Sequence, residues 1–256
     1  MLNMSDAPSY SKPPVSEALI DIRIDPVPSE FLRPLENLYD RLAKDYPDKK
    51  TRYQYTGGIK VDEGKVVSTS AAGGPIGYWF QSEDARRLIQ VRLDGFTFNR
   101  LKPDPNERWP GWLIMREEAK SAWELYAQAL GLGEIIRLAV RYINQIVIPQ
   151  ASVELNDYLT TPPQIPQGLP FHNIGRFFTR TEIPIPDLKA TAILTQAPAQ
   201  VKSRDSVALT LDIDVFKNER FPADTSILWE NLDRLRDLKN MIFEACLHQR
   251  AKELFI

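Results

Sequence analysis

The stretch TSILWENLDRLRDLKNMIFEACLHQRAKELF, residues 225–255, decides the fold that the sequence predicts. Its apolar residues recur every three or four positions, the spacing of an amphipathic helix, at Leu228, Leu232, Leu235, Leu238, Ile242 and Cys246. Neither glycine nor proline interrupts it, and Asp224 or Thr225 can cap its first turn. At about 1.5 Å per residue, a helix of about 30 residues is about 45 Å long. We therefore expect one long helix that covers a large sheet.

The segments before this helix alternate apolar and polar residues in short runs, which is the pattern of half-buried strands. The clearest runs are 18–25 and 88–98. The other strand candidates are 52–55, 59–61, 65–68, 77–81, 135–149, 174–183, 190–196 and 207–216. The other helix candidates are 31–42, 112–131 and 152–159. The glycine-rich stretch 71–77 is expected to form a hairpin between strands.

The order of strand, helix, several strands and helix occurs twice along the chain, with a join near Gly133. Residues 89–96 match residues 209–216 at a constant offset, which places Asp94 opposite Asp214. The match is short, so an internal duplication and a chance likeness of two amphipathic strands both remain open. We expect an N-terminal arm at 1–14, a first half at 15–133 and a second half at 134–256, with the two halves packed as one unit.

Runs of strands that are each closed by a helix predict an α+β fold. If the two halves join edge to edge, they form one continuous, curved antiparallel sheet with two long helices on one face. This order of elements resembles the TATA-binding-protein-like and helix-grip folds. The likeness concerns architecture only, because a fold does not determine a function.

Composition narrows the classes of function. The chain of 256 residues has 26% charged residues and a net charge of -2, so it lacks the general attraction to phosphate backbones of a nonspecific nucleic-acid coat protein. That balance still leaves room for a local basic patch. A single cysteine excludes an internal disulfide framework, and no stretch approaches the roughly 18 uninterrupted apolar residues of a membrane span. We expect a cytoplasmic protein without a membrane segment.

Four fragments of the chain carry a family resemblance. They are Lys12-Pro13-Pro14 followed by Glu17-Ala18, Arg141-Tyr142-Ile143-Asn144 leading to Ile148-Pro149, Asp212-Ile213-Asp214-Val215, and Leu235–Phe243. In these fragments and in length, the chain resembles a sporadically distributed family of bacterial proteins to which no activity is assigned. The resemblance covers nearly the whole chain and implies no catalytic residue. The sporadic distribution suggests genes on mobile or defence-related islands.

One face of the predicted sheet gathers charged side chains. If Ile20, Leu93 and Ile213 face the helices, alternation places the neighbouring charges on the other face. The candidate binding residues there are Arg23, Arg92, Asp94, Arg141, Asp212 and Asp214. Such a face is either simply solvated or a concave recognition surface for a partner protein, a polar ligand or a strand of nucleic acid. Arg141 needs a carboxylate if it is buried, so we expect an ion pair across the sheet before a substrate.

Two other patterns allow more specific interpretations. Asp212 and Asp214 lie about 7 Å apart on one strand face, and with Asp94 nearby they could hold Mg²⁺ for phosphoryl transfer, because hard cations bind carboxylate oxygens. The pattern Asp-x-Asp is common by chance, and no Gly-Lys-Ser/Thr phosphate loop accompanies it. Basic and aromatic residues interleave at 49–55, which suits a nucleic-acid contact or an edge strand protected by lysines.

With two histidines and one cysteine, the chain has few residues that could form a hydrolytic triad or a histidine-rich metal site. The first hypothesis is therefore a non-catalytic interaction or accessory protein, without metal or cofactor, that binds a partner protein through the charged sheet face or the groove between the long helices. The alternatives are a metal-dependent enzyme that acts on phosphates and a small-molecule carrier with a cavity between sheet and helix. A nucleic-acid partner is not favoured, and the oligomeric state stays open.

Overall fold

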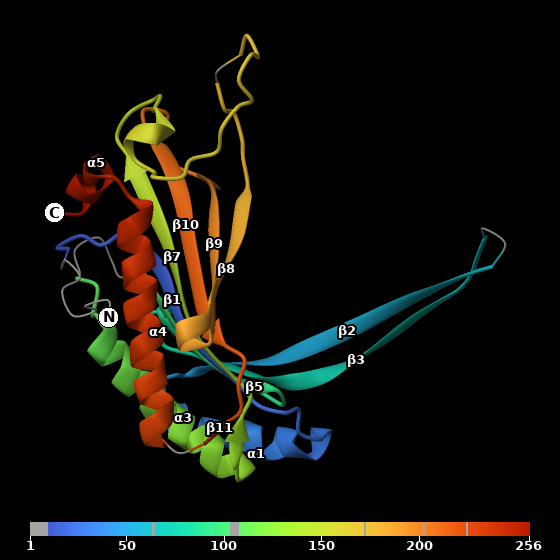
Figure 1. Cartoon of the computed structure of the whole chain (residues 1–256). Coiled ribbons are helices and arrows are strands. Elements are labelled where there is room, and N and C mark those ends of the chain that lie inside the picture. Colours follow the sequence, from blue (N-terminus) through green and yellow to red (C-terminus); the bar gives the residue numbers. More distant parts are fainter. Residues whose placement is uncertain (1–9, 63–64, 103–107, 172, 202, 224) are drawn as a thin grey trace.

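The computed structural model describes residues 10–62, 65–102, 108–171, 173–201, 203–223 and 225–256 (Figure 1). In this part of the chain, nine strands form one antiparallel sheet in the order β2-β3-β4-β5-β1-β7-β10-β9-β8, and β6 pairs with β11. The strands are β1 Val15–Arg23, β2 Asp48–Asp62, β3 Lys65–Gln81, β4 Arg87–Arg92, β5 Gly95–Leu101, β6 Glu134–Ile135, β7 Arg137–Ile148, β8 Thr179–Ile185, β9 Ala190–Ala199, β10 Val207–Lys217 and β11 Phe221–Pro222. The helices are α1 Leu32–Asn37, α2 Tyr39–Leu42, α3 Trp112–Leu130, α4 Thr225–Cys246 and α5 Gln249–Lys252. The predicted α+β fold with a large antiparallel sheet is confirmed.

Strand β1 lies at the centre of the sheet, between β5 and β7. Its residues alternate as predicted, with Ile20 and Ile22 fully buried on one face and Asp21 and Arg23 on the other. Strands β1 and β7 pair in antiparallel register, with Ile20 opposite Val140. These are the first long strands of the two predicted halves, so their pairing joins both halves in one sheet.

The helices pack against the apolar face of this sheet, the face of Ile20 and Ile22. The contacts are those of Trp123 in α3 with Phe96 in β5, of Lys239 in α4 with Tyr142 in β7, and of Tyr39 in α2 with Phe80 in β3. Figure 1 shows α4 running alongside the strands of the second half. None of the described helices combines the length and the apolarity that crossing a membrane requires.

Helix α4 is shorter than the sequence predicts, because it ends at Cys246 instead of near Phe255. Its backbone carbonyls find partners in another segment at this point. Thr160 donates its backbone N–H to the carbonyl oxygen of Cys246 (3.0 Å) and its hydroxyl to that of Ala245 (2.8 Å). These bonds satisfy carbonyl groups that a helix end leaves free. The 22 residues of α4 span about 33 Å, and the chain then bends into α5.

Residues 88–98 form a hairpin, not the single strand that alternation predicts. Strand β4 ends and β5 begins within this range. The close approach of β1 requires the glycine that opens β5, because a Cβ at Gly95 would lie 2.4 Å from the carbonyl oxygen of Ile22. The predicted match of two strand segments is therefore wrong in its register, since Asp94 lies in a turn whereas Asp214 lies within β10.

Strands β2 and β3 form a two-stranded ribbon that projects from the sheet (Figure 1). The sequence predicts four short strands here and a hairpin at 71–77, whereas the structure places 71–77 within β3. Glycine and proline in this stretch predict a break, but residues 71–75 and 77 pair with β2, with a register irregularity between Arg52 and Tyr53. Within the described residues, β3 pairs with β4 only from Gly77 to Gln81. Beyond that range the ribbon depends on the pairing of its own two strands.

The described end of the predicted N-terminal arm lies against the C-terminal segment. The hydroxyl of Tyr10 donates to the carboxylate of Glu244 (2.9 Å), and the backbone N–H of Lys12 donates to the carbonyl oxygen of Phe255 (2.8 Å). Residues 1–9 of the predicted arm lie outside the described residues. The part that follows them is thus tied to the last helical turns of the chain.

Replacement of Gly95 by alanine is expected to lower the free energy of unfolding by about 2 to 3 kcal/mol, because the new Cβ overlaps the backbone of β1. Gly133→Ala is the matched control, because a Cβ there meets no atom within 4 Å. Gly133→Ala is expected to lower the free energy of unfolding by less than about 0.5 kcal/mol. Urea unfolding followed by circular dichroism measures both variants. An equal decrease in the free energy of unfolding of the two variants would contradict the close approach of β5 to β1.

Lys239 is a buried basic side chain on the helix-covered face. It is 6% exposed, and its Nζ lies 3.8 Å from the centroid of the Tyr142 ring. Burial, and then the positive charge of Arg236, lower the pKa of Lys239 from 10.5 to about 7 against the opposing charge of Glu244. The folded protein therefore holds this amine partly uncharged near neutral pH.

Lys239→Met is expected to stabilise the protein most at pH 7 and below. Between pH 7 and pH 10.5 the unfolded chain binds a proton that the folded chain does not, so the stability of the wild type rises with pH across this window. The shift corresponds to a cost of about 5 kcal/mol for the charged amine in the folded state. Urea unfolding should therefore show a gain on the order of 5 kcal/mol at pH 6 that shrinks at pH 9.

The exposed Lys44→Met variant is the control for this measurement. This substitution removes an exposed amine and leaves Lys239 in place. The difference in free energy of unfolding between Lys44→Met and the wild type should therefore be the same at pH 6 and pH 9. A gain in Lys239→Met that is equal at both pH values would show that burial of the amine does not disfavour its charged form.

Candidate functional site

The open face of the sheet is the face that points away from the helices. Its charged and polar side chains occupy adjacent register positions on neighbouring strands. Asp21 of β1 lies opposite Thr97 of β5 and Ala139 of β7, and Asp214 of β10 lies opposite Arg141 of β7. Alternation along each strand therefore brings side chains from distant parts of the sequence together on one surface. The charged residues of this surface and its rim are Asp21, Arg23, Arg92, Asp94, Arg137, Arg141, Asp212 and Asp214.

Asp21 is the centre of this surface. Its Oδ2 accepts hydrogen bonds from Arg23 (2.9 Å) and Arg137 (2.8 Å). Its Oδ1 accepts them from the hydroxyl of Thr97 (2.6 Å) and from Arg92 (3.2 Å). Burial by itself raises the pKa of Asp21, but the charge of Arg23, the Thr97 hydrogen bond and the other two arginines outweigh it and hold the pKa below its usual value.

Asp94 extends this network from the turn between β4 and β5. Its carboxylate accepts hydrogen bonds from Arg92 (3.0 Å) and from Arg23 (2.7 Å). Arg92 is only 3% exposed, and it also donates to Thr97 (2.8 Å). Each donor group of this buried guanidinium thus has an acceptor, which offsets the cost of removing the charge from water.

A second group of charges lies on β7 and β10. Arg141 donates two hydrogen bonds to the carboxylate of Asp212, at 2.9 and 2.6 Å, so the predicted ion pair across the sheet is present. Hydrogen bonding to Asp212 raises the pKa of Arg141 above its usual value. Arg137 reaches Asp214 at 3.4 Å and lies over the ring of Phe216. The other oxygen of Asp214, Oδ1, is buried without a hydrogen-bond partner, and burial raises the pKa of this carboxyl.

A pocket of about 420 Å³ opens between these groups. Its lining comes from both halves of the sheet and reaches the edge strand β2. The basic residues in its wall are Arg23, Arg52, Arg92, Arg137 and Arg141. Asp21, Asp214 and the indole of Trp79 also contribute to the wall. The open face is therefore hollowed, and arginine is the dominant residue of the hollow.

All six residues that the sequence selects lie on this face or at its rim. Three of them, Arg23, Arg92 and Asp94, form one connected network, and Arg141 with Asp212 forms a separate pair. Sequence reasoning missed the role of Arg137, although it lies two residues before Ala139 and four before Arg141 in the same alternation. It also missed Arg52 and Trp79 as pocket residues, because the strand pairing that places Arg52 opposite Gly77, and Gly77 opposite Arg92, could not be read from the sequence.

The aspartates of the open face accept hydrogen bonds from arginine side chains. Asp94, Asp212 and Asp214 each accept at least one hydrogen bond from a guanidinium. Among the residues that the structure describes, no group of three or more histidine, cysteine or acidic side chains is arranged to hold a metal ion. Guanidinium groups contact five of the six oxygens of these carboxylates, all except Oδ1 of Asp214, so this geometry favours charge pairing over the predicted alternative of a Mg²⁺ site.

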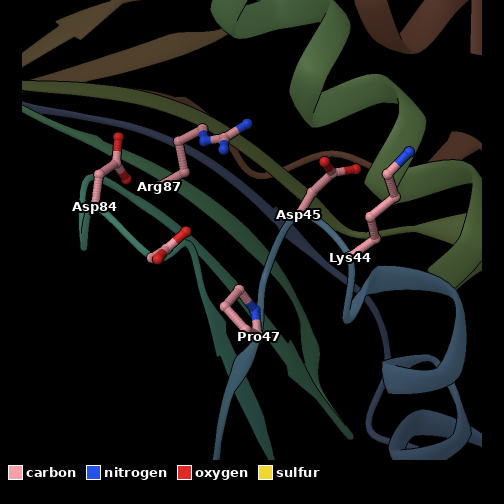
Figure 2. Close-up of a pocket in the computed structure, with 6 residues that line it drawn as sticks. Lys44, Asp45, Pro47, Asp84 and Arg87 are labelled. Atoms are coloured by element: carbon pink, nitrogen blue, oxygen red, sulfur yellow. The ribbon is translucent and has the colours of Figure 1, made fainter.

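A second pocket, of about 390 Å³, lies beside the turn between β3 and β4 (Figure 2). Lys44 and Asp45 lie on one side of it and Asp84 on the other. The carboxylate of Asp84 accepts hydrogen bonds from the hydroxyl of Ser82 and the backbone N–H of Arg86. These bonds stabilise the turn. The other charged residues of the lining are Lys44, Asp45, Glu83 and Arg87.

Cys246 and His248 lie apart from the open face. Cys246 is buried, and burial raises the pKa of its thiol to about 11. A thiol of that pKa is a poor nucleophile at neutral pH. His248 is exposed at the start of α5. The expectation that Cys246 is a small core residue is confirmed.

The basic and aromatic residues at 49–55 lie on edge strand β2. Lys49 pairs with Glu36 of α1 at 3.0 Å. Tyr53 and Tyr55 are exposed, and their rings stack with centroids 6.1 Å apart. The edge position agrees with the protective role proposed for lysines on an unpaired strand edge.

Asp21→Asn is expected to lower the free energy of unfolding by about 3 kcal/mol, because it leaves a buried arginine network without its central negative charge. Asp25→Asn is the control, since Asp25 forms an exposed pair with Arg220 and should cost less than about 1 kcal/mol. The folded-state pKa of Asp21 is lowered, so its contribution is present above the unfolded pKa of about 4 and is lost as the pH falls through the folded value. Urea unfolding at pH 7 and pH 3 measures both variants. If the decrease in the free energy of unfolding of Asp21→Asn is as large at pH 3 as at pH 7, the assignment of Asp21 as the central charge is wrong.

Comparisons of the chain with protein-family models, with curated proteins and with solved structures find no match. An inference about function therefore depends on the residues themselves. The strongest feature among the described residues is the hollowed, arginine-rich open face of the sheet.

Proposed function

We propose that this protein is a non-catalytic binding protein that recognises a partner protein through the open face of its sheet. The observation that carries the proposal is the pocket of about 420 Å³ in a surface whose arginines and aspartates already hold one another in position. A partner then meets charged groups whose orientation is fixed before binding, which lowers the entropy cost of association.

The charge pairing favours binding over catalysis. A metal-dependent phosphate-processing enzyme would need the carboxylates of Asp94, Asp212 and Asp214 as ligands, and arginines already contact all three. A carrier would hold its ligand between sheet and helices, whereas this pocket lies on the opposite face. Mixed charges suit a protein partner with complementary charges better than a polyanion such as nucleic acid.

We also propose that the sheet arose by duplication of a unit of strand, helix, strands and helix, with halves at 15–133 and 134–256. Two features support this. Strands β1 and β7 pair at the centre, and the strands on their outer sides, β5 and β10, each lead to a long helix, α3 or α4. The same arrangement supports the TATA-binding-protein-like order of elements, and the family resemblance and the single cysteine suggest a bacterial cytoplasmic setting.

Affinity capture from a lysate of the native host tests the binding role. The wild type is compared with the double variant Arg23→Gln/Arg141→Gln, whose side chains are 36% and 43% exposed and can be changed without opening the core. Arg220→Gln is the control, because it removes one exposed arginine outside the pocket wall. We expect one protein to be retained by wild type and control and lost from the double variant, with at least a tenfold weaker affinity in calorimetry.

Equal recovery of the same proteins by all three baits would overturn recognition through the open face. The enzyme alternative has its own test, a calorimetric titration with Mg²⁺ or Mn²⁺ of the wild type and of Asp212→Ala/Asp214→Ala. Binding heat in the wild type that disappears in this variant would favour the metal-dependent enzyme instead.

A further inference from the structure

Arg52 differs from the other arginines in the wall of the pocket. Its guanidinium donates a hydrogen bond to the side-chain oxygen of Gln90, and within the described residues it contacts no carboxylate. The other four arginines of the wall each form an ion pair with at least one aspartate. These arginines are Arg23, Arg92, Arg137 and Arg141.

Among the described residues, Arg52 is thus the arginine of the wall that has no ion-pair partner. Five arginines line the wall, and the carboxylates paired with the other four are those of Asp21, Asp94, Asp212 and Asp214. An unpaired guanidinium beside a hollow presents a fork of N–H donors that matches the two oxygens of a carboxylate or phosphate.

The surroundings of Arg52 disfavour its charge in the absence of a ligand. Burial, then the nearby positive charge of Arg92, and also that of Arg23 lower the pKa of Arg52, against the opposing negative charges of Asp94 and Asp21. An incoming anion would offset both effects. It would therefore gain more from Arg52 than from a solvated arginine on an ordinary surface.

Trp79 adds an unused donor to the same wall. Its indole lines the pocket, and its Nε1–H is buried without an acceptor in the structure. A buried N–H group without a partner is unfavourable, so an acceptor that reached it would stabilise the complex. Arg52 and Trp79 lie near each other, because Trp79 is two residues from Gly77, the register partner of Arg52 on the adjacent strand.

We propose that Arg52 anchors a carboxylate-binding subsite in the open face, which receives one acidic side chain of the partner protein. This inference rests on the proposed function. A single guanidinium without an ion-pair partner matches one carboxylate, and the negative charges of Asp94 and Asp21 that act on it disfavour a phosphate monoester with two charges. The neighbouring aspartates disfavour a run of phosphodiesters, and the volume of about 420 Å³ accommodates a whole side chain with its carboxylate.

The test is an NMR titration of ¹⁵N-labelled full-length protein with propionate, a monocarboxylate that serves as the probe for one acidic side chain. We expect saturable shifts of the Arg52 Nε–H and Trp79 indole N–H signals, assigned with Arg52→Gln and Trp79→Phe, and a Kd on the order of millimolar. Arg52→Gln should weaken binding by about tenfold or more. Lys50→Gln is the matched control, since it removes one positive charge two residues away on the same strand, and it should change the Kd less than twofold.

Dimethyl phosphate and inorganic phosphate, at equal ionic strength, are the competing probes. Tighter binding of dimethyl phosphate would indicate a nucleic-acid backbone, tighter binding of inorganic phosphate a phosphate ligand, and either would overturn the carboxylate assignment. The absence of saturable shifts in the wild type, or equal binding by Arg52→Gln with an otherwise unchanged spectrum, would overturn the subsite itself.

The two proposals can fail separately. If propionate binding depends on Arg52 but the captured proteins do not depend on Arg23 and Arg141, the subsite stands and the partner-binding role of the face fails. If capture depends on those two arginines but propionate does not bind, the face recognises a partner without a carboxylate subsite at Arg52.

Discussion

The pairing of β1 with β7 is the constraint on which the rest of the structure depends. It joins the two halves of the chain in one sheet, and it places Asp21 between the strands that carry Arg92 and Arg137. On the opposite face the same pairing places Ile20 beside Val140 in the core beneath the helices. One strand register therefore fixes both the apolar core and the charge arrangement, and a shift by one residue would exchange the two faces.

The charges of the open face form an ordered but costly surface. Burying a guanidinium such as that of Arg92 is unfavourable unless all of its donors are satisfied, and here Asp21, Asp94 and Thr97 satisfy them. Apolar residues would cover the same area at lower cost. The retention of this network is understandable if the fixed orientation of the arginines serves recognition, which is the role proposed for the face.

Much of this arrangement could be predicted from local pattern, and the rest depends on tertiary contacts. Alternation along β1, β7 and β10 sufficed to place Arg141 near a carboxylate on the open face. Alternation could not separate β4 from β5, because the turn at Asp94 continues the apolar spacing and the need for Gly95 arises only from its contact with β1. The carbonyl groups at the end of α4 are bound by Thr160, a residue distant in sequence, and the pocket position of Arg52 follows from the pairing of β2 with β3 and of β3 with β4.

The depth of the Asp21 network determines how it responds to dissolved salt. The side chains of Asp21 and Arg92 are only 14% and 4% exposed, so mobile ions cannot approach them as they approach a surface pair such as Arg220 with Asp25. Screening at physiological ionic strength acts over about 8 Å in water and weakens exposed pairs, but it acts much less on buried ones. Dissolved salt therefore has little effect on the orientation of Arg92, whereas it does weaken the long-range attraction between the protein and a charged partner.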